Sequence, residues 1–182
     1  MIKLKTNLIT AALLLICCFS QAQFVKEHGR LSVLGTQLVD KNNQPVVLRG
    51  LSFGWHSMWP RFYNEKAVNW LKKDFNCNVV RAALGIELGE YAYLKDPQFS
   101  KQKIEAVVNG AIKSDIYVII DWHSHNINLK EAKEFFAEIS KKYAKYPNII
   151  YEVFNEPDYE SWAEVKSYSE EIIKVIREND PN

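Results

Sequence analysis

Apolar and polar positions along this chain alternate between two spacings, one typical of strands and the other of helices. Two short apolar runs around Gly35, between Leu31 and Asp40, predict a small hairpin, and the turn residues 42–45 lead into the run Val46–Gly50. We expect that run to be the first main strand. Three later runs predict further strands: 77–83, 117–122 and 149–154. The last two are continuously apolar, as expected of strands buried on both faces.

Each strand run is followed by a stretch with helical periodicity. Asn64 can cap a helix that reaches about Phe75, with Trp70 expected in the core, and Ser161 with Glu164 forms a capping box for the last helix. Apolar residues at helical spacing mark the other helical faces: Ile104, Val107, Val108, Ala111 and Ile112, then Ala132, Phe135, Phe136, Ile139 and Tyr143, then Val165, Tyr168, Ile172, Ile173 and Ile176.

The resulting order, strand then helix four times, predicts an α/β fold with parallel strands and right-handed crossovers. Eight such units close into a (β/α)8 barrel, which takes roughly 250 residues, whereas this chain has 182. We therefore expect a TIM barrel truncated to about its first four β-α units, preceded by the hairpin. The alternative is a complete four-stranded domain, which would leave two strand edges unpaired.

The first residues have the pattern of an export signal. Lys3 and Lys5 precede an apolar segment, residues 8–19, and small residues follow at 20–22. We expect a signal peptide over residues 1–22, a catalytic-domain segment over 23–182, and a protein that is secreted, periplasmic or on the cell surface. A membrane anchor is disfavoured because the segment is shorter than the ~20 residues of a spanning helix, and a lipid anchor at Cys17 or Cys18 because Ile16 fits that role poorly.

The charge balance gives no indication of a nucleic-acid partner, and the cysteine content excludes an internal disulfide. Loss of Lys3 and Lys5 shifts the formal balance of 23 basic and 22 acidic residues from +1 to −1, so no basic face for nucleic acid is indicated. No membrane contact is expected beyond the export signal, and the oligomeric state stays open. Cys77 is the only cysteine after residue 22, which excludes an internal disulfide and predicts a small core residue.

Chemically active residues fall at or near the ends of the predicted strands. The stretch 52–60 follows the first strand, Arg81 lies in the second, Asp121-Trp122-His123 ends the third and Asn155-Glu156-Pro157 ends the fourth. Because the carboxyl ends of parallel strands converge, we expect these residues at one mouth.

A carboxyl group beside aromatic platforms suits the cleavage of sugar polymers. An acid must protonate the departing glycosidic oxygen, and a second carboxylate must attack or stabilise the sugar carbon. Flat sugar faces stack on Trp55 and Trp59, while Asn, His and Arg side chains bind hydroxyls. Structural interpretations remain open: Arg81 could pair with a structural acid, His123 could be an interior histidine, the two tryptophans could be loop packing, and Asn-Glu-Pro could be only a turn.

Four segments resemble the motifs of glycoside hydrolase family 5, the cellulase family, in order and with the spacing of its bacterial β-1,4-endoglucanases. They are Leu48–Ser52, Val80–Ala83, Tyr117–His123 and Asn155–Pro157. The resemblance covers residues 31–182, so the chain is similar to the N-terminal half of such an enzyme.

This resemblance implies a (β/α)8 barrel and a retaining double displacement on β-1,4-glucan, with a β-1,4-linked polysaccharide or oligosaccharide as the partner. Glu156 matches the acid/base, Asn155 the residue that holds the sugar 2-hydroxyl, and Arg81 the residue that orients the nucleophile. Substrate contacts are also implied for His123, His56, Trp59 and Trp55. The family nucleophile ends strand seven, beyond this chain, so we assign it to no residue here and expect the chain alone to be inactive.

There are three alternatives to the interpretation as an endo-β-1,4-glucanase. A β-1,4-mannanase shares the motifs, because they specify the mechanism better than the sugar. A non-catalytic glucan-binding piece could use Trp55, Trp59 and Trp122 as platforms. A metal-dependent hydrolase is suggested by His123-Ser124-His125, but strand four offers no further ligand set, and we expect no metal and no cofactor.

Overall fold

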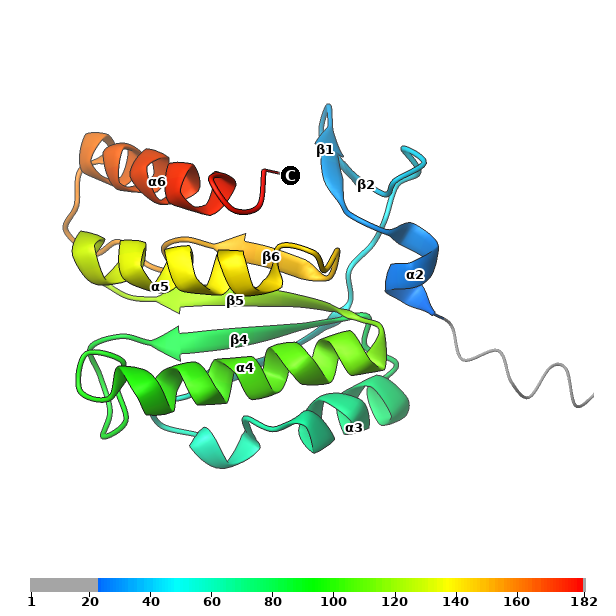
Figure 1. The fold of residues 1–182 in the computed structure, drawn as a ribbon, viewed down its shortest axis with the longest axis horizontal. Coiled ribbons are helices and arrows are strands. Elements are labelled where there is room, and N and C mark those ends of the chain that lie inside the picture. Colours follow the sequence, from blue (N-terminus) through cyan, green and yellow to red (C-terminus); the bar gives the residue numbers. More distant parts are fainter. Residues whose placement is uncertain (1–22, 182) are drawn as a thin grey trace, which may run out of the picture.

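The computed structural model describes residues 23–181, and the predicted signal peptide lies outside this range. Its centre is a four-stranded parallel sheet in the order β3-β4-β5-β6, with its strands running in the same direction (Figure 1). In chain order the elements are α2 (Phe24–His28), β1 (Ser32–Leu34), β2 (Gln37–Val39), β3 (Gly50–Trp55), the 3-10 helix η1 (Pro60–Phe62), α3 (Glu65–Phe75), β4 (Val79–Gly85), α4 (Pro97–Ser114), β5 (Tyr117–His123), α5 (Leu129–Tyr143), β6 (Ile149–Glu152) and α6 (Trp162–Arg177). The predicted alternation of parallel strands and helices is confirmed.

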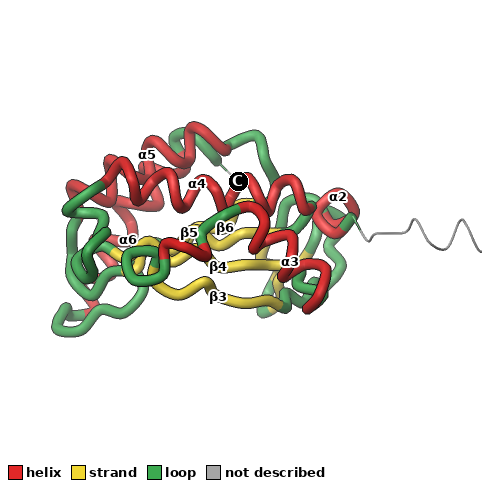
Figure 2. The backbone as a smooth tube through the Cα atoms, turned by 90° about the horizontal axis from the view of Figure 1, so that it is seen from below, coloured by secondary structure: helices red, strands yellow, loops and turns green. Residues whose placement is uncertain are grey.

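The helices are not spread evenly over the sheet. Helices α3, α4 and α5 cover one face, and the other face carries none of the three (Figure 2). Side chains on successive strand residues point to opposite faces, so β4 sends Val80, Ala82 and Leu84 into the helical core. The intervening Arg81 lies on the other face, which we call the open face.

The core between sheet and helices is dominated by aromatic and branched side chains. Trp122 is fully buried and its ring lies 5.6 Å from that of Phe135 and 6.1 Å from that of Phe136. Cys77 is 5% exposed, as predicted. Burial on this scale contributes roughly 25 cal/mol for each Å² of apolar surface, and it holds the strand register that positions the open face.

Helix caps form where the sequence predicts them. The Asn64 side chain accepts a hydrogen bond from Ala67 N–H at 2.9 Å. Ser161 and Glu164 make the reciprocal capping box at the start of α6. These contacts satisfy backbone donors that an uncapped helix leaves free, so the starts of both helices are set locally.

Two predictions about the first part of the chain are wrong, and one element was not predicted. The first main strand begins at Gly50 rather than Val46, so residues expected after the strand form part of it. Trp70 is 52% exposed and packs edge-on against Phe75 instead of entering the core. Helix α2 has no counterpart among the predictions. Pairing of β3 with β4 and packing of α2 near Tyr117 are long-range contacts, which local patterns do not specify.

The hairpin β1–β2 and helix α2 lie at the N-terminal end of the strands, opposite the strand arrowheads (Figure 1). Arg30 pairs there with Asp180 at 3.1 Å and donates to Ala144 O at 3.0 Å, which ties the start of the described chain to its end. Asp40 accepts from Asn42 and Gln44 N–H and pairs with His28. Across residues 23–181, no helix combines the length and apolar character needed to cross a bilayer.

Candidate active site

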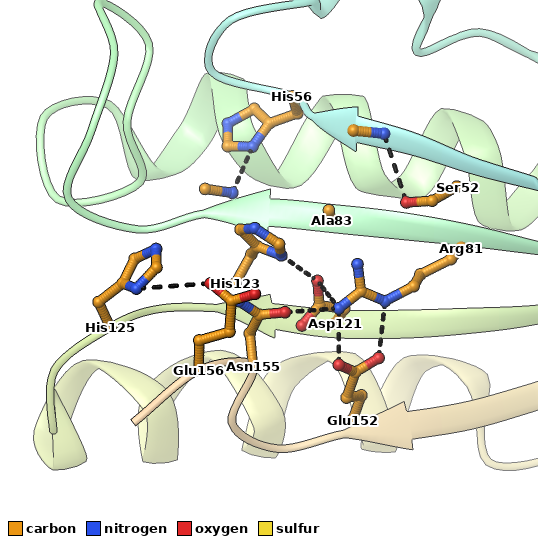
Figure 3. Close-up of polar contacts among 12 residues, drawn as sticks. Ser52, His56, Arg81, Ala83, Asp121, His123, His125, Glu152, Asn155 and Glu156 are labelled. Carbon is orange, nitrogen blue, oxygen red and sulfur yellow. Dashed lines mark hydrogen bonds and ion pairs between the residues drawn. The ribbon is translucent and has the colours of Figure 1, made fainter. Parts of the chain in front are cut away.

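Arg81 is the centre of a polar cluster on the open face, toward the C-terminal ends of β4, β5 and β6 (Figure 3). Its Nε and Nη2 donate to the two carboxylate oxygens of Glu152 at 2.7 and 2.6 Å. Nη2 also lies 2.9 Å from Asp121 Oδ2 and donates to Asn155 Oδ1 at 2.8 Å. One guanidinium therefore joins β4 to β5, to β6 and to the segment that follows β6.

Asp121 is completely buried in this cluster. His123 Nδ1 lies 2.6 Å from its Oδ2, and this short contact makes Nδ1 the protonated nitrogen of His123. Burial raises the pKa of the Asp121 carboxyl, and the nearby charge of Glu152 adds to this, against the lowering effects of His123 and Arg81. His123 and Arg81 therefore both favour the ionised form of Asp121 against the cost of its burial.

Glu156 differs from the other carboxylates of the site. Its backbone N–H donates to Ser124 O at 3.2 Å, which fixes the chain just after β6. Its side chain is 65% exposed, and one of its carboxylate oxygens faces His125 (Figure 3). Glu152 is 32% exposed and is bound at both oxygens by Arg81. Glu156 is thus the carboxyl in this cluster that is free to exchange a proton.

Asn155 lies between the ion-pair cluster and Glu156. Its Oδ1 accepts a hydrogen bond from Arg81, which orients the amide so that Nδ2 points away from the guanidinium. Within the described residues, Nδ2 is buried and has no hydrogen-bond partner. A donor left unsatisfied in this way costs free energy unless another group accepts its hydrogen bond.

Trp55 borders the site, and Trp59 follows it in the chain, with its backbone N–H donating to Trp55 O at 3.0 Å. The ring of Trp55, at the end of β3, lies 4.8 Å from His123 and 5.7 Å from His125. Trp59 is 48% exposed and lies against Gly54, where a Cβ would come within 3.2 Å of its ring; Gly54 also has a φ of 68°, which favours glycine. These rings offer one half-buried and one exposed aromatic surface.

His56 does not belong to the site, which corrects the prediction of a substrate contact. It is 0% exposed. Its Nδ1 accepts from Gly85 N–H at 3.0 Å, and Nε2 lies 3.0 Å from Tyr91 O and 2.8 Å from Ser100 Oγ. Burial lowers its pKa to about 4, so it is a neutral internal brace between β4 and α4.

The structure brings together Arg81, Asn155, Glu156 and His123, with Trp55 against His123. It also places there three residues that the motifs do not assign: Glu152, His125 and Asp158. Glu152 could have been found, because it is the one acid inside the apolar run 149–154. Among residues 23–181, no three His, Cys, Asp or Glu side chains are grouped as a metal site, so His123 and His125 gain no support as ligands.

The chain matches the family model for cellulase (glycosyl hydrolase family 5) over residues 39–182. It is 39% identical over 161 residues to an endoglucanase of Clostridium saccharobutylicum, covering 85% of this chain and 36% of that protein. It is 45% identical over 132 residues to Endoglucanase Z of Dickeya dadantii, covering 71% of this chain and 30% of that protein.

Solved structures agree with the sequence comparison. A protein from Cytophaga hutchinsonii is 46% identical with a TM-score of 0.83 over 86% of this chain and 52% of its own. The catalytic domain of a Thermobifida fusca endoglucanase, in complex with cellotetraose, is 36% identical with a TM-score of 0.81 and the same coverage. The chain thus spans about a third of those curated relatives and about half of these solved chains.

Replacing Arg81 with Met should destabilise the protein at neutral pH by about 3 kcal/mol, because Asp121 and Glu152 lose their shared partner. The difference in unfolding free energy between Arg81→Met and wild type should be smaller at acidic pH. Burial raises the pKa of Asp121, so this carboxyl takes up its proton at a higher pH than an exposed aspartate does, and the missing cation then matters less. Urea unfolding at pH 7 and pH 4 measures both effects.

The exposed Arg177 supplies a matched control, and Arg177→Met should change the free energy of unfolding by less than about 0.5 kcal/mol. Equal stability of Arg81→Met and wild type, or a deficit that does not depend on pH, would contradict the role given to Arg81.

Proposed function

The chain belongs to glycoside hydrolase family 5, and from this premise we propose that it carries the acid/base side of the active site of a retaining endo-β-1,4-glucanase. One observation carries the proposal: Glu156 presents a carboxyl that is 65% exposed directly beside the Arg81–Asn155 cluster. The other acids of that cluster, Asp121 and Glu152, are occupied by Arg81. Glu156 alone among these three acids is free to reach a substrate.

Glu156 acts twice in this mechanism. As an acid, it gives its proton to the glycosidic oxygen while the bond from that oxygen to the sugar carbon breaks and the carboxylate nucleophile bonds to the carbon. As a base, it then takes a proton from the water that displaces the nucleophile. The same oxygen can serve both steps, because the departing sugar vacates the position that the water enters.

The nucleophile is assigned to none of the described residues. A retaining mechanism needs two carboxyl groups about 5–5.5 Å apart, and the bidentate contacts of Glu152 and the burial of Asp121 make both unsuitable. Because the chain covers 52% of the solved catalytic domain that it resembles, the proposal concerns the activity of the whole protein.

We assign the substrate contacts to other residues. We assign the Asn155 amide to a sugar hydroxyl, since its Nδ2 is a donor without a partner among the described residues. Trp59 offers an exposed aromatic face for stacking on a pyranose ring. His123, at 9% side-chain exposure, can reach substrate only through the edge of its ring.

We propose β-1,4-glucan rather than β-1,4-mannan as the polymer. The support comes from the relatives: several similar proteins are endoglucanases, and the Thermobifida fusca domain was solved with cellotetraose. Export is part of the proposal as well, and it rests on the signal pattern of residues 1–22, outside the described structure.

Glu156→Gln should lower kcat/KM for cellotetraose by about 100-fold to 10,000-fold, because the amide cannot give or take the proton. Hydrolysis of cellotetraose by the full-length protein measures it. Glu170→Gln, an equally exposed acid on α6 at 63%, should leave the rate unchanged. Full activity of Glu156→Gln would contradict the assignment of Glu156 as the acid/base.

Trp59→Ala should raise the Kd for cellotetraose roughly tenfold, or about 1.4 kcal/mol, because a stacking surface is lost. Trp70→Ala is a matched control: Trp70 is 52% exposed against 48% for Trp59, but it lies on α3 beside Phe75. Calorimetric titration with cellotetraose measures the Kd of both variants, and Trp70→Ala should bind as tightly as wild type. Equal losses of affinity would remove the special role of Trp59.

A further inference from the structure

His125 lies beside the proposed acid/base without a role in the motifs. Its Nδ1 is 3.7 Å from Glu156 Oε2 and 3.5 Å from Asp158 Oδ2. In the described structure that nitrogen is buried and makes no hydrogen bond. A buried polar nitrogen between two carboxylates, just beyond hydrogen-bond distance of each, requires an explanation.

The loop that carries His125 is anchored on both sides of this residue. Ser124 O accepts from the backbone N–H of Glu156 at 3.2 Å. The Ser124 hydroxyl donates to Glu87 and accepts from Asn126 N–H at 3.1 Å. The amide of Asn128 also donates to Glu87, at 2.6 Å. His125 is thereby held against the segment that bears Glu156.

The ring itself has little freedom to turn away. Trp55 lies 5.7 Å from it and the His123 ring 6.4 Å, both centroid to centroid, and the side chain is 22% exposed. Figure 3 shows Nδ1 facing the Glu156 carboxyl. The two carboxylates are more exposed, at 65% and 51%, so they are the mobile partners and the imidazole is the fixed one.

We propose that His125 is a positioning residue for Glu156, an inference that rests on the proposed glycosidase function. With both neighbours being acceptors, Nδ1 carries the proton. A small rotation of Glu156 closes the 3.7 Å gap, as hydrogen bonds of catalytic groups tighten when substrate binds.

Asp158 gives the ring a second acceptor, and together the two carboxylates keep the ring proton on Nδ1. When Glu156 is ionised and acts as a base, Nδ1–H donates to it and holds its second oxygen away from the water. When Glu156 carries the proton for the leaving oxygen, Nδ1–H donates to its other oxygen, which remains an acceptor. The protonated Glu156 oxygen is then free to face the glycosidic bond, and the imidazole keeps its place throughout.

The inference predicts a loss that depends on the leaving group. His125→Leu should lower kcat/KM for cellotetraose roughly tenfold, because a misplaced acid delivers its proton poorly. For 2,4-dinitrophenyl β-cellobioside, kcat/KM should stay within about twofold of wild type, since this leaving group departs as an anion and needs no proton. Both are measured in the full-length protein.

Two variants separate positioning from folding. Asn places an amide donor near the position of Nδ1, so His125→Asn should recover most of the lost cellotetraose activity. Lys130→Leu, at a side chain 80% exposed just beyond the loop, introduces the same apolar group and should have no effect. Adding Asp158→Leu to His125→Leu should cost nothing more, because Asp158 acts only through the imidazole.

The outcomes are distinguishable. If wild type cleaves neither substrate, the proposed function fails and this inference fails with it. If wild type is active, Glu156→Gln is impaired and His125→Leu matches wild type, the inference alone is overturned. An equal loss on both substrates, or no recovery with Asn, also overturns it, because either result indicates a general structural role.

Discussion

The shared ion pairing of Arg81 is the interaction on which the rest of the site depends. A guanidinium placed among strands β4, β5 and β6 must be matched by carboxylates, because removing charges from water is costly unless they are paired. Here Asp121 and Glu152 supply that match and Asn155 takes a further hydrogen bond. The cluster fixes three strand ends relative to one another. It also occupies two carboxylates fully, which leaves Glu156 as the acid that is free to react.

Histidines in this chain show how position decides chemistry. His56 is sealed behind β4 and neutral, because burial lowers its pKa to about 4. His123 is tied to Asp121 and extends the Arg81 cluster. His125, two residues later, faces Glu156 and Asp158 from an anchored loop. Only the last lies where it can respond to the charge of Glu156, the proposed acid/base. The remainder of the open face is apolar around Ile119 and Ile150, in keeping with barrel interiors, which are filled by branched side chains.

The sequence predicts the features that local rules govern. Periodicity gave the β-α order, and capping chemistry at Asn64 and Ser161 gave two helix starts. Residues at the ends of parallel strands converge by topology, which is why Arg81, His123, Asn155 and Glu156 could be grouped in advance. The features that were not predicted depend on contacts between residues far apart in the sequence. The start of β3 depends on its pairing with β4, and the burial of His56 on Tyr91 and Ser100. The structural use of Glu152 depends on a residue 71 positions away.

Chemical rescue of Glu156→Ala by azide tests the central claim most directly. With 2,4-dinitrophenyl β-cellobioside, the first step needs no acid, and the variant should stall at the glycosyl-enzyme because no base activates water. Azide needs no base, so the account predicts that it restores turnover and yields β-cellobiosyl azide, while it leaves the wild type unchanged. Turnover of the variant that azide does not accelerate, with no azide product formed, would contradict the assignment of Glu156.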